Sequence, residues 1–346
     1  MKVLVTGGAG FIGSHLVDVL MQCGYKVVVF DNLSSGKIEN VERWLKDENF
    51  RFVRGDLCWR EEIRKAVVGC DVIFHFAANP DVRAAATAHF GDVIGTFNLL
   101  ESLRDISISK FIFASSSTVY GEAERIPTPE DYAPLLPISM YGASKLACEA
   151  LVSSYAHSLG FKAIILRLTN VGPRSSHGVI YDFIMKLRRN PKELEILDDG
   201  SQMKSYLYID DCIDAIMLIT EKFNGDIEVF NVGSEDQVNV GRIAEIVVEV
   251  LNLKDVKFKF TGGVNGGRGW KGDVKVMLLN ASRLTSLGWK PNIIAKHNSE
   301  AAVRKAAEHL AREITELGMI SVIILSKNNG DTLDRCLESI IESDRK

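Results

Sequence analysis

The strongest constraint on the fold is a rhythm in the first half of the chain, where short apolar runs alternate with segments of helical spacing. Such alternation predicts βαβ units and a parallel sheet. Strands covered by helices on both faces are continuously apolar, as the runs VVVF and VIFHF nearly are. We therefore expect an α/β fold built on a doubly wound parallel sheet. The predicted strands are Lys2 to Val5, Lys26 to Phe30, Arg51 to Arg54, Val72 to Phe76, Phe111 to Ala114 and Ala163 to Leu168.

The rhythm ends near Asn170, and the elements that follow are irregular. We expect two domains, with the parallel sheet in residues 1–170 and a smaller mixed α/β domain mainly in residues 171–313. Some segments of the second part return to the first domain. Apolar spacing there predicts helices over Ile180 to Arg189, Asp210 to Ile219 and Val240 to Leu251, and a strand over Val256 to Phe260.

The composition of the chain argues against nucleic acid, metal ions and membranes as binding partners. The 346 residues carry a formal net charge of −4, whereas binding to nucleic acid requires a basic surface. Six cysteines without a CxxC pair or a histidine cluster predict neither a metal site nor disulfides. No stretch approaches the roughly 20 apolar residues of a membrane span, and the N-terminus lacks the apolar core of a signal peptide. We expect a cytoplasmic protein that binds no nucleic acid and no metal and spans no membrane.

A glycine motif, Gly7-Gly8-Ala9-Gly10-Phe11-Ile12-Gly13, lies between the first predicted strand and a helix that begins near Ser14. Glycines there permit a tight turn, and free N–H groups at the helix N-terminus bind phosphate, so the motif predicts a dinucleotide site.

Asp31 ends the second strand, 18 residues after Gly13, where a carboxylate binds ribose hydroxyls and repels a 2′-phosphate. NAD is therefore expected rather than NADP. The alternatives are a plain glycine turn and a solvated Asp31 that opens the next turn.

Tyr141 and Lys145 form a YxxxK pair on a predicted helix, where residues four apart share a face. If NAD⁺ lies beside that face, the Lys145 ammonium and the positive nicotinamide favour the phenolate of Tyr141, which could then act as a general base. The hydroxyl run Ser115-Ser116-Ser117-Thr118 follows the fifth predicted strand, at the edge where such sheets bind ligands. One of these hydroxyls should share a substrate proton with Tyr141, and the spacing alone does not choose among them.

Nine segments in order resemble the extended short-chain dehydrogenase/reductase family, and within it the UDP-glucose 4-epimerase-like group. They are TGGAGFIG, DNLSSG, GDL, HFAANP, SSSTVYG, YGASK, NVGPR, DGSQ and LGWKP. The resemblance covers about Met1 to Pro291. It implies a Rossmann-type domain for NAD in residues 1–170 and nucleotide-sugar binding mainly in residues 171–313. The implied reaction is NAD-dependent epimerisation of a UDP-sugar at carbon 4, with UDP-glucose and UDP-galactose as the pair.

The resemblance also assigns residues. The catalytic set is Ser116, Tyr141 and Lys145. The cofactor contacts are Gly7, Gly10, Phe11, Ile12, Gly13, Asp31, Asn32, Asp56, Leu57, Phe76, Ala77, Ala78, Tyr141 and Lys145. The substrate contacts are Ser116, Asn170, Lys204 and Arg268. Three positions depart from common family residues, namely Lys204 in place of Arg, Asp92 in place of Asn and Pro80 in place of Lys. At Lys204 a point charge replaces a bidentate fork, so the nucleotide contact differs there.

Other functions remain compatible with these motifs. Epimerisation of another UDP-sugar, such as an N-acetylhexosamine or a uronate, is not distinguished by them. A 4,6-dehydratase needs an acid and a base, which related enzymes take from a Thr-Asp-Glu triplet, whereas this chain has Ser116-Ser117-Thr118. A non-catalytic NAD-binding regulator is a further alternative, because a fold does not establish an activity. Relatives are often dimers built on the helices after Phe90 and Met140, so the resemblance implies a homodimer.

The tail, residues 314–346, is expected to form a unit of its own. Ile320 to Leu325 predicts a strand, Ser326 to Asp331 a loop, and an amphipathic helix begins near Thr332. The segment ISVIILSKNNGDTLDRCLESI resembles the opening strand and helix of a family 2 glycosyltransferase domain, whose metal-binding acidic motif this sequence lacks. The alternative is a terminal strand and helix that pack on the main body.

Overall fold

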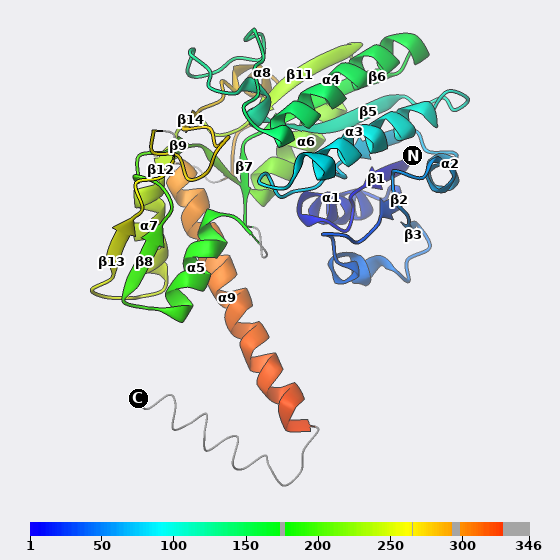
Figure 1. Ribbon diagram of the computed structural model, residues 1–346. Helices are drawn as coiled ribbons and strands as arrows, with labels where there is room; N and C mark the ends of the chain where they lie inside the picture. The colour runs from blue at the N-terminus through cyan, green and yellow to red at the C-terminus, as the bar shows by residue number, and fades with distance from the viewer. Residues whose placement is uncertain (174–176, 265, 293–297, 328–346) are drawn as a thin grey trace.

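A computed structural model describes residues 1–173, 177–264, 266–292 and 298–327, with side chains described as far as Thr315. A seven-stranded sheet forms the larger part of the molecule, and its strands run parallel in the order β11-β6-β5-β4-β1-β2-β3 (Figure 1). The strands are β1 (Lys2–Thr6), β2 (Lys26–Asp31), β3 (Phe50–Arg54), β4 (Val72–His75), β5 (Lys110–Ser116), β6 (Lys162–Leu168) and β11 (Ile227–Val232).

The order of the strands reverses at β1. In the register of the sheet, Val3 of β1 pairs with Val27 of β2 on one side and with Val72 of β4 on the other. The loops that leave β1 and β4 therefore diverge, and doubly wound sheets bind ligands in the crevice at such a switch point. The predicted doubly wound sheet is confirmed, and all six predicted strands are present with ends within two residues of those expected.

Alternate residues of the strands enter separate cores on the two faces of the sheet. Val3 and Val5 pack toward the helices on one face of the sheet, whereas Leu4 packs toward the helices on the other face. Full burial of each aliphatic side chain contributes about 1.5–3 kcal/mol, and these three are fully buried. The covering helices are α1 (Phe11–Gln22) and α6 (Ile209–Lys222) on one face, and α2 (Arg60–Val67), α3 (Ala86–Glu101) and α4 (Met140–Leu159) on the other.

The second part of the chain forms smaller sheets beside a group of helices, at the left of Figure 1. Helices α5 (Val179–Arg189), α7 (Val240–Val250) and α9 (Asn298–Lys327) pack against one another. The predicted helices at α5, α6 and α7 and the predicted strand at β13 (Lys257–Phe260) are confirmed. The sheets are β7 (Asn170–Gly172) with β10 (Tyr206–Tyr208), β8 (Glu193–Ile196) with β13 (Lys257–Phe260), and β9 (Met203–Lys204) with β12 (Val238–Asn239) and β14 (Val276–Met277). The remaining helices are α8 (Ser282–Ser286), η1 (Ile38–Trp44) and η2 (Ser117–Tyr120).

The prediction of a strand over Ile320 to Leu325 is wrong, because α9 continues through this segment to Lys327. A six-residue apolar run does not by itself distinguish a strand from a helix. The run follows good helix formers in α9, and extending a helix adds one hydrogen bond for each residue that is fixed. The rest of the predicted loop and the helix expected from Thr332 lie outside the described residues.

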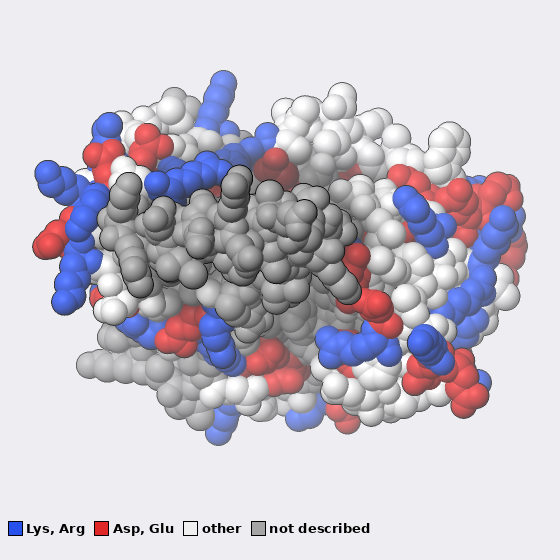
Figure 2. Space-filling view, turned by 90° about the horizontal axis from the view of Figure 1, so that it is seen from below, with Lys and Arg blue, Asp and Glu red and all other residues white. Residues whose placement is uncertain are grey.

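Among the described helices, none has an apolar stretch of the length needed to cross a membrane. On the face of the molecule shown in Figure 2, positive and negative side chains are interspersed over the described surface. This face therefore presents no extended region of one charge among the residues that the structure describes.

Candidate active site

The turn between β1 and α1 is built for glycine. Gly7 has φ of +70°, and a Cβ atom there would lie 2.6 Å from the backbone nitrogen of Ala77. A Cβ atom on Gly13 would lie 2.1 Å from the carbonyl oxygen of Gly7, so the first turn of α1 packs directly on the loop. Gly10 is the N-cap of α1 and has no side chain that could occupy the helix N-terminus. The turn therefore leaves backbone N–H groups and the positive end of the helix dipole accessible to an anion.

Asp31 lies at the carboxyl end of β2 and bonds to the glycine turn. Its Oδ2 accepts a hydrogen bond from Ala9 N at 2.9 Å, and its Oδ1 accepts one from Leu33 N at 2.8 Å. Burial raises the pKa of this carboxyl, and the two backbone N–H groups partly offset that effect. Each oxygen keeps a second lone pair that can accept a ligand hydroxyl.

Beside Asp31, Asn32 donates from Nδ2 to Oδ2 of Asp56 at 2.9 Å. The pKa of Asp56 is lowered, chiefly by the hydrogen bond from Cys58 N. These side chains stand at the ends of β2 and β3, next to Leu57. The structure thus brings the predicted adenosine contacts to one edge of the sheet.

A cavity of about 770 Å³ runs along this edge, within the usual range for a site that holds a small organic ligand. Its lining includes every residue that we assigned to NAD from the sequence, together with Ser116 and Asn170. Pro80 and Asp92, two positions that differ from common family residues, also line it. The glycine turn and the Ser116, Tyr141 and Lys145 side chains therefore share one cavity.

Tyr141 and Lys145 lie on the first turns of α4, whose N-terminus is capped by Ser139 accepting from Gly142 N at 3.1 Å. Lys145 is buried, and its Nζ donates to the carbonyl oxygen of Ala114 at 2.7 Å. That ammonium lies 5.8 Å from the centre of the Tyr141 ring. The hydrogen bond to β5 thus holds a positive charge close to the tyrosine.

Ser115 and Ser116, at the end of β5, differ in the hydrogen bonds that their hydroxyl groups form. Ser115 donates to the buried carboxylate of Glu149 at 2.5 Å, and that carboxylate also forms a buried ion pair with Arg167. Ser116 Oγ accepts from Thr118 N at 3.2 Å and from Thr118 Oγ1 at 3.0 Å. In the bonds found within the described part of the chain, Ser116 Oγ acts only as an acceptor, so its own hydrogen can be donated to a ligand.

Lys204 and Arg268 do not line the cavity. Lys204 of β9 forms a partly buried ion pair with Asp273, with Nζ to Oδ1 at 2.5 Å. Arg268 donates to Glu122 at 2.9 Å. The loop that carries Arg268 and Asp273 also reaches the segment before α4, because a Cβ atom on Gly272 would lie 2.9 Å from the carbonyl oxygen of Ile138. Both cations therefore belong to a second cluster, which adjoins the start of α4.

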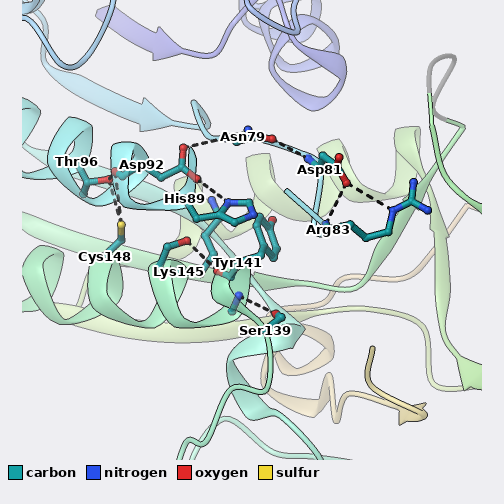
Figure 3. A network of polar contacts seen from close by, with 12 residues as sticks. Asn79, Asp81, Arg83, His89, Asp92, Thr96, Ser139, Tyr141, Lys145 and Cys148 are labelled. Carbon is teal, nitrogen blue, oxygen red and sulfur yellow. Dashed lines mark hydrogen bonds and ion pairs between the residues drawn. The ribbon is translucent and has the colours of Figure 1, made fainter. Parts of the chain in front are cut away.

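One neighbour of Tyr141 was not predicted. The His89 ring of α3 packs edge to face on the Tyr141 ring, with centroids 5.5 Å apart (Figure 3). Its Nδ1 lies 3.4 Å from Oδ2 of Asp92, one turn along the same helix. The contact joins separate helices, so spacing along the chain could not reveal it. One indication of this contact was present in the sequence, because His89 shares a helix face with Asp92, which stands where the family commonly has Asn.

The comparisons with known proteins agree with this geometry. The pattern of the NAD dependent epimerase/dehydratase family matches residues 3–233. A Methanocaldococcus jannaschii protein, whose provisional name is UDP-glucose 4-epimerase, is 33% identical over 312 residues, which cover 87% of this chain and 97% of that protein.

Two solved structures are also similar to this chain. A UDP-galactose 4-epimerase has 45% sequence identity and a TM-score of 0.78, covering 90% of this chain and 99% of its own. A Bacillus cereus UDP-glucuronic acid 4-epimerase, solved with UDP-glucuronic acid and NAD, has 29% identity and a TM-score of 0.79, covering 91% of this chain and 100% of its own. The chain therefore belongs to the NAD-dependent epimerase/dehydratase family of nucleotide-sugar enzymes.

Proposed function

We propose that the chain is a cytoplasmic isomerase that epimerises a UDP-sugar at carbon 4, with UDP-glucose and UDP-galactose as its substrate pair. The observation that carries the proposal is that Ser116, Tyr141 and Lys145 line the same cavity as the glycine turn. The similar UDP-galactose 4-epimerase supports this choice of sugar. Among the described residues, Cys23, Cys58, Cys70 and Cys148 carry free thiols, in keeping with a reducing compartment.

The residues of the cavity fit the NAD of this family. The Cβ positions at Gly7 and Gly13 are filled by neighbouring backbone, and α1 begins without a side-chain cap. We assign the pyrophosphate to this turn, and the adenosine to Asp31 and its neighbours at the ends of β2 and β3. When bound, NAD supplies the reversible two-electron oxidant that chemistry at a secondary alcohol requires.

Tyr141 takes the proton of the C4 hydroxyl and later returns it to the same oxygen, once hydrogen has been added to carbon 4 from the opposite face of the sugar. The Lys145 ammonium, anchored on Ala114 O, stabilises the phenolate form that accepts this proton. Ser116 donates its hydroxyl hydrogen to the reacting sugar oxygen and so orients it. Ser115 is less suited to this role because its hydroxyl is engaged by Glu149. The 4-keto sugar formed between the two proton transfers presents its other face before reduction.

The nucleotide of the substrate provides an anchor that lets the hexose turn without leaving. We assign NAD to residues 1–170 and the nucleotide sugar mainly to residues 171–313, with contacts from Asn170, Lys204 and Arg268. Asn170 already lines the cavity. Lys204 and Arg268 each hold a carboxylate, so a diphosphate would compete with Asp273 and Glu122 for them.

The chain is also expected to be a homodimer. On α3, the exposed side chains Phe90, Ile94 and Phe97 follow one helical face. On the adjacent α4, Ala143 and Ala147 are exposed and small enough to let another helix approach. An Ile94→Glu substitution should produce monomers in light scattering, whereas Val68→Glu, an exposed position on the segment after α2, should leave a dimer.

The test of the function is to incubate the purified protein with UDP-galactose, without added cofactor, and to follow UDP-glucose formation. UDP-N-acetylgalactosamine and UDP-glucuronate are run in parallel, because a uronate enzyme has a closely similar fold. Formation of UDP-glucose supports the proposal. Turnover of only another sugar changes the substrate, loss of water from the hexose indicates a dehydratase, and no turnover leaves an NAD-binding regulator.

A further inference from the structure

A buried carboxylate lies beside the tyrosine of the candidate site. Asp92 is on α3, and its side chain is 13% exposed. Its Oδ1 accepts from Asn79 N at 2.9 Å, and its Oδ2 faces Nδ1 of His89 (Figure 3). Burying a carboxylate is unfavourable unless partners stabilise it. Because little water surrounds the Asp92 carboxylate, its charge interacts strongly with the neighbouring side chains.

His89 connects Asp92 to Tyr141. The His89 side chain is 1% exposed, and its ring packs on the Tyr141 ring at an interplanar angle of 68°. An ionised carboxylate can only accept, so the Nδ1 that faces it carries the proton. Nε2 is buried and has no hydrogen-bond partner among the described residues. Asp92 thus holds the His89 ring in one orientation against Tyr141.

The titratable groups that face Asp92 come from four elements of the described chain. They are His89 on α3, Lys145 and Cys148 on α4, Cys58 after β3, and His75 on β4 behind Thr96. Burial raises the pKa of the Cys148 thiol and lowers the pKa of His75 to about 3, so both are neutral near pH 7. Among these groups, Lys145 exerts the largest charge effect on Asp92. Burial raises the pKa of Asp92, and Lys145 partly reverses that effect.

We propose that Asp92 is a positioning residue for Tyr141, which holds the tyrosine ring through His89 and opposes the charge of Lys145. The inference rests on the proposed acid–base role of Tyr141. A positive charge alone favours the phenolate, and a nearby negative charge disfavours it. The Asp92 carboxylate therefore opposes the effect of the Lys145 charge on the phenolate of Tyr141. A neutral Asn at this position removes the charge and keeps an acceptor for Asn79 N.

The experiment measures the tyrosine directly. Ultraviolet titration of the NAD-loaded protein, minus the same titration of Tyr141→Phe, isolates the phenolate of Tyr141. The subtraction is repeated in an Asp92→Asn background. We expect the midpoint, and the acid limb of the kcat profile, to move down by about half to one pH unit, the Coulomb scale for a partly buried charge several ångströms away. Asp105→Asn, the same change on a side chain that is 80% exposed, should move neither.

Two further variants test the contact through His89. His89→Phe keeps an aromatic ring against Tyr141 and should hold the pH-independent kcat within about twofold, whereas His89→Ala should lower kcat several-fold with little change in KM. Equal kcat in the two variants would overturn the positioning role. An unmoved midpoint and acid limb in Asp92→Asn would overturn the electrostatic role. Full activity of Tyr141→Phe would instead overturn the proposed function, so the two failures are distinguishable.

Discussion

The residues that we assign to NAD and those that we assign to the nucleotide sugar differ in how their side chains are held. Every residue assigned to NAD lines one cavity at the edge of a seven-stranded sheet. Lys204 and Arg268 instead lie outside that lining, among strands of two residues, and each is paired with a carboxylate. The glycine turn, the ends of the strands and α4 hold the first group, whereas individual ion pairs hold the second. Substitutions should therefore have larger and less adjustable effects in the first group.

The largest effect is expected at Tyr141, where phenylalanine keeps the ring and removes the proton carrier. We expect kcat to fall by about 10³-fold, the range that general acid–base catalysis supplies. NAD should remain bound, because the glycine turn is unchanged. The measurement is the rate of UDP-galactose turnover together with the NAD content of the purified variant. A rate within tenfold of the wild-type value would contradict the assignment.

Gly13→Ala tests how rigid the glycine turn is. The new Cβ atom would lie 2.1 Å from the carbonyl oxygen of Gly7, and backbone cannot yield as a flexible side chain does. We expect NAD affinity to fall by about 100-fold, or about 3 kcal/mol, measured by fluorescence titration. The matched control is Gly233→Ala, whose Cβ atom meets side chains at ordinary contact distances from 3.4 Å. Equal NAD affinity in the two variants would contradict the prediction that the glycine turn is rigid.

His75 makes a prediction about stability against pH. It is buried between Thr6 and Thr96, and burial lowers its pKa to about 3 from about 6.5. Below pH 6.5 the unfolded chain binds a proton that the folded chain does not. The contribution of the neutral His75 to the free energy of unfolding is therefore complete above pH 6.5, and it declines as the pH falls toward 3.

We expect the wild type to lose about 2 kcal/mol more than His75→Gln between pH 7 and pH 5, because the amide keeps a donor and an acceptor but does not titrate. Urea unfolding of both proteins at the two pH values measures the difference. Parallel losses in the two proteins would show that His75 is not the group responsible.

The smallest effect is expected among the residues that we assign to the nucleotide sugar. Lys204→Met should raise KM for the UDP-sugar about tenfold with kcat nearly unchanged, since it removes one charge from the binding of both ground and transition states. Lys186→Met, which removes an exposed pair with Glu195, should leave KM as it is. A change in kcat alone would place Lys204 at the chemistry instead and break the contrast between the two groups of residues.

The same contrast describes what the sequence could predict. The strands, the glycine turn and the YxxxK pair follow local rules of periodicity, so their meeting at one sheet edge was foreseeable. The contact of His89 with Tyr141, and the pairing of Lys204 with Asp273, join segments far apart in the chain and have no local signature. The helix at Ile320 to Leu325 was missed because a short apolar run suits either structure.

The hydrogen bond from Ala9 N to Asp31 limits how cofactor preference can evolve or be engineered. Admitting a 2′-phosphate requires that the negative charge at position 31 be removed. A small neutral residue there would also leave the N–H groups of Ala9 and Leu33 without their acceptor. On the role that we propose for Asp31, selectivity for the adenosine ribose and the shape of the glycine turn would therefore change together. A successful exchange of NAD for NADP would need a compensating change in the loop, made together with the substitution at position 31.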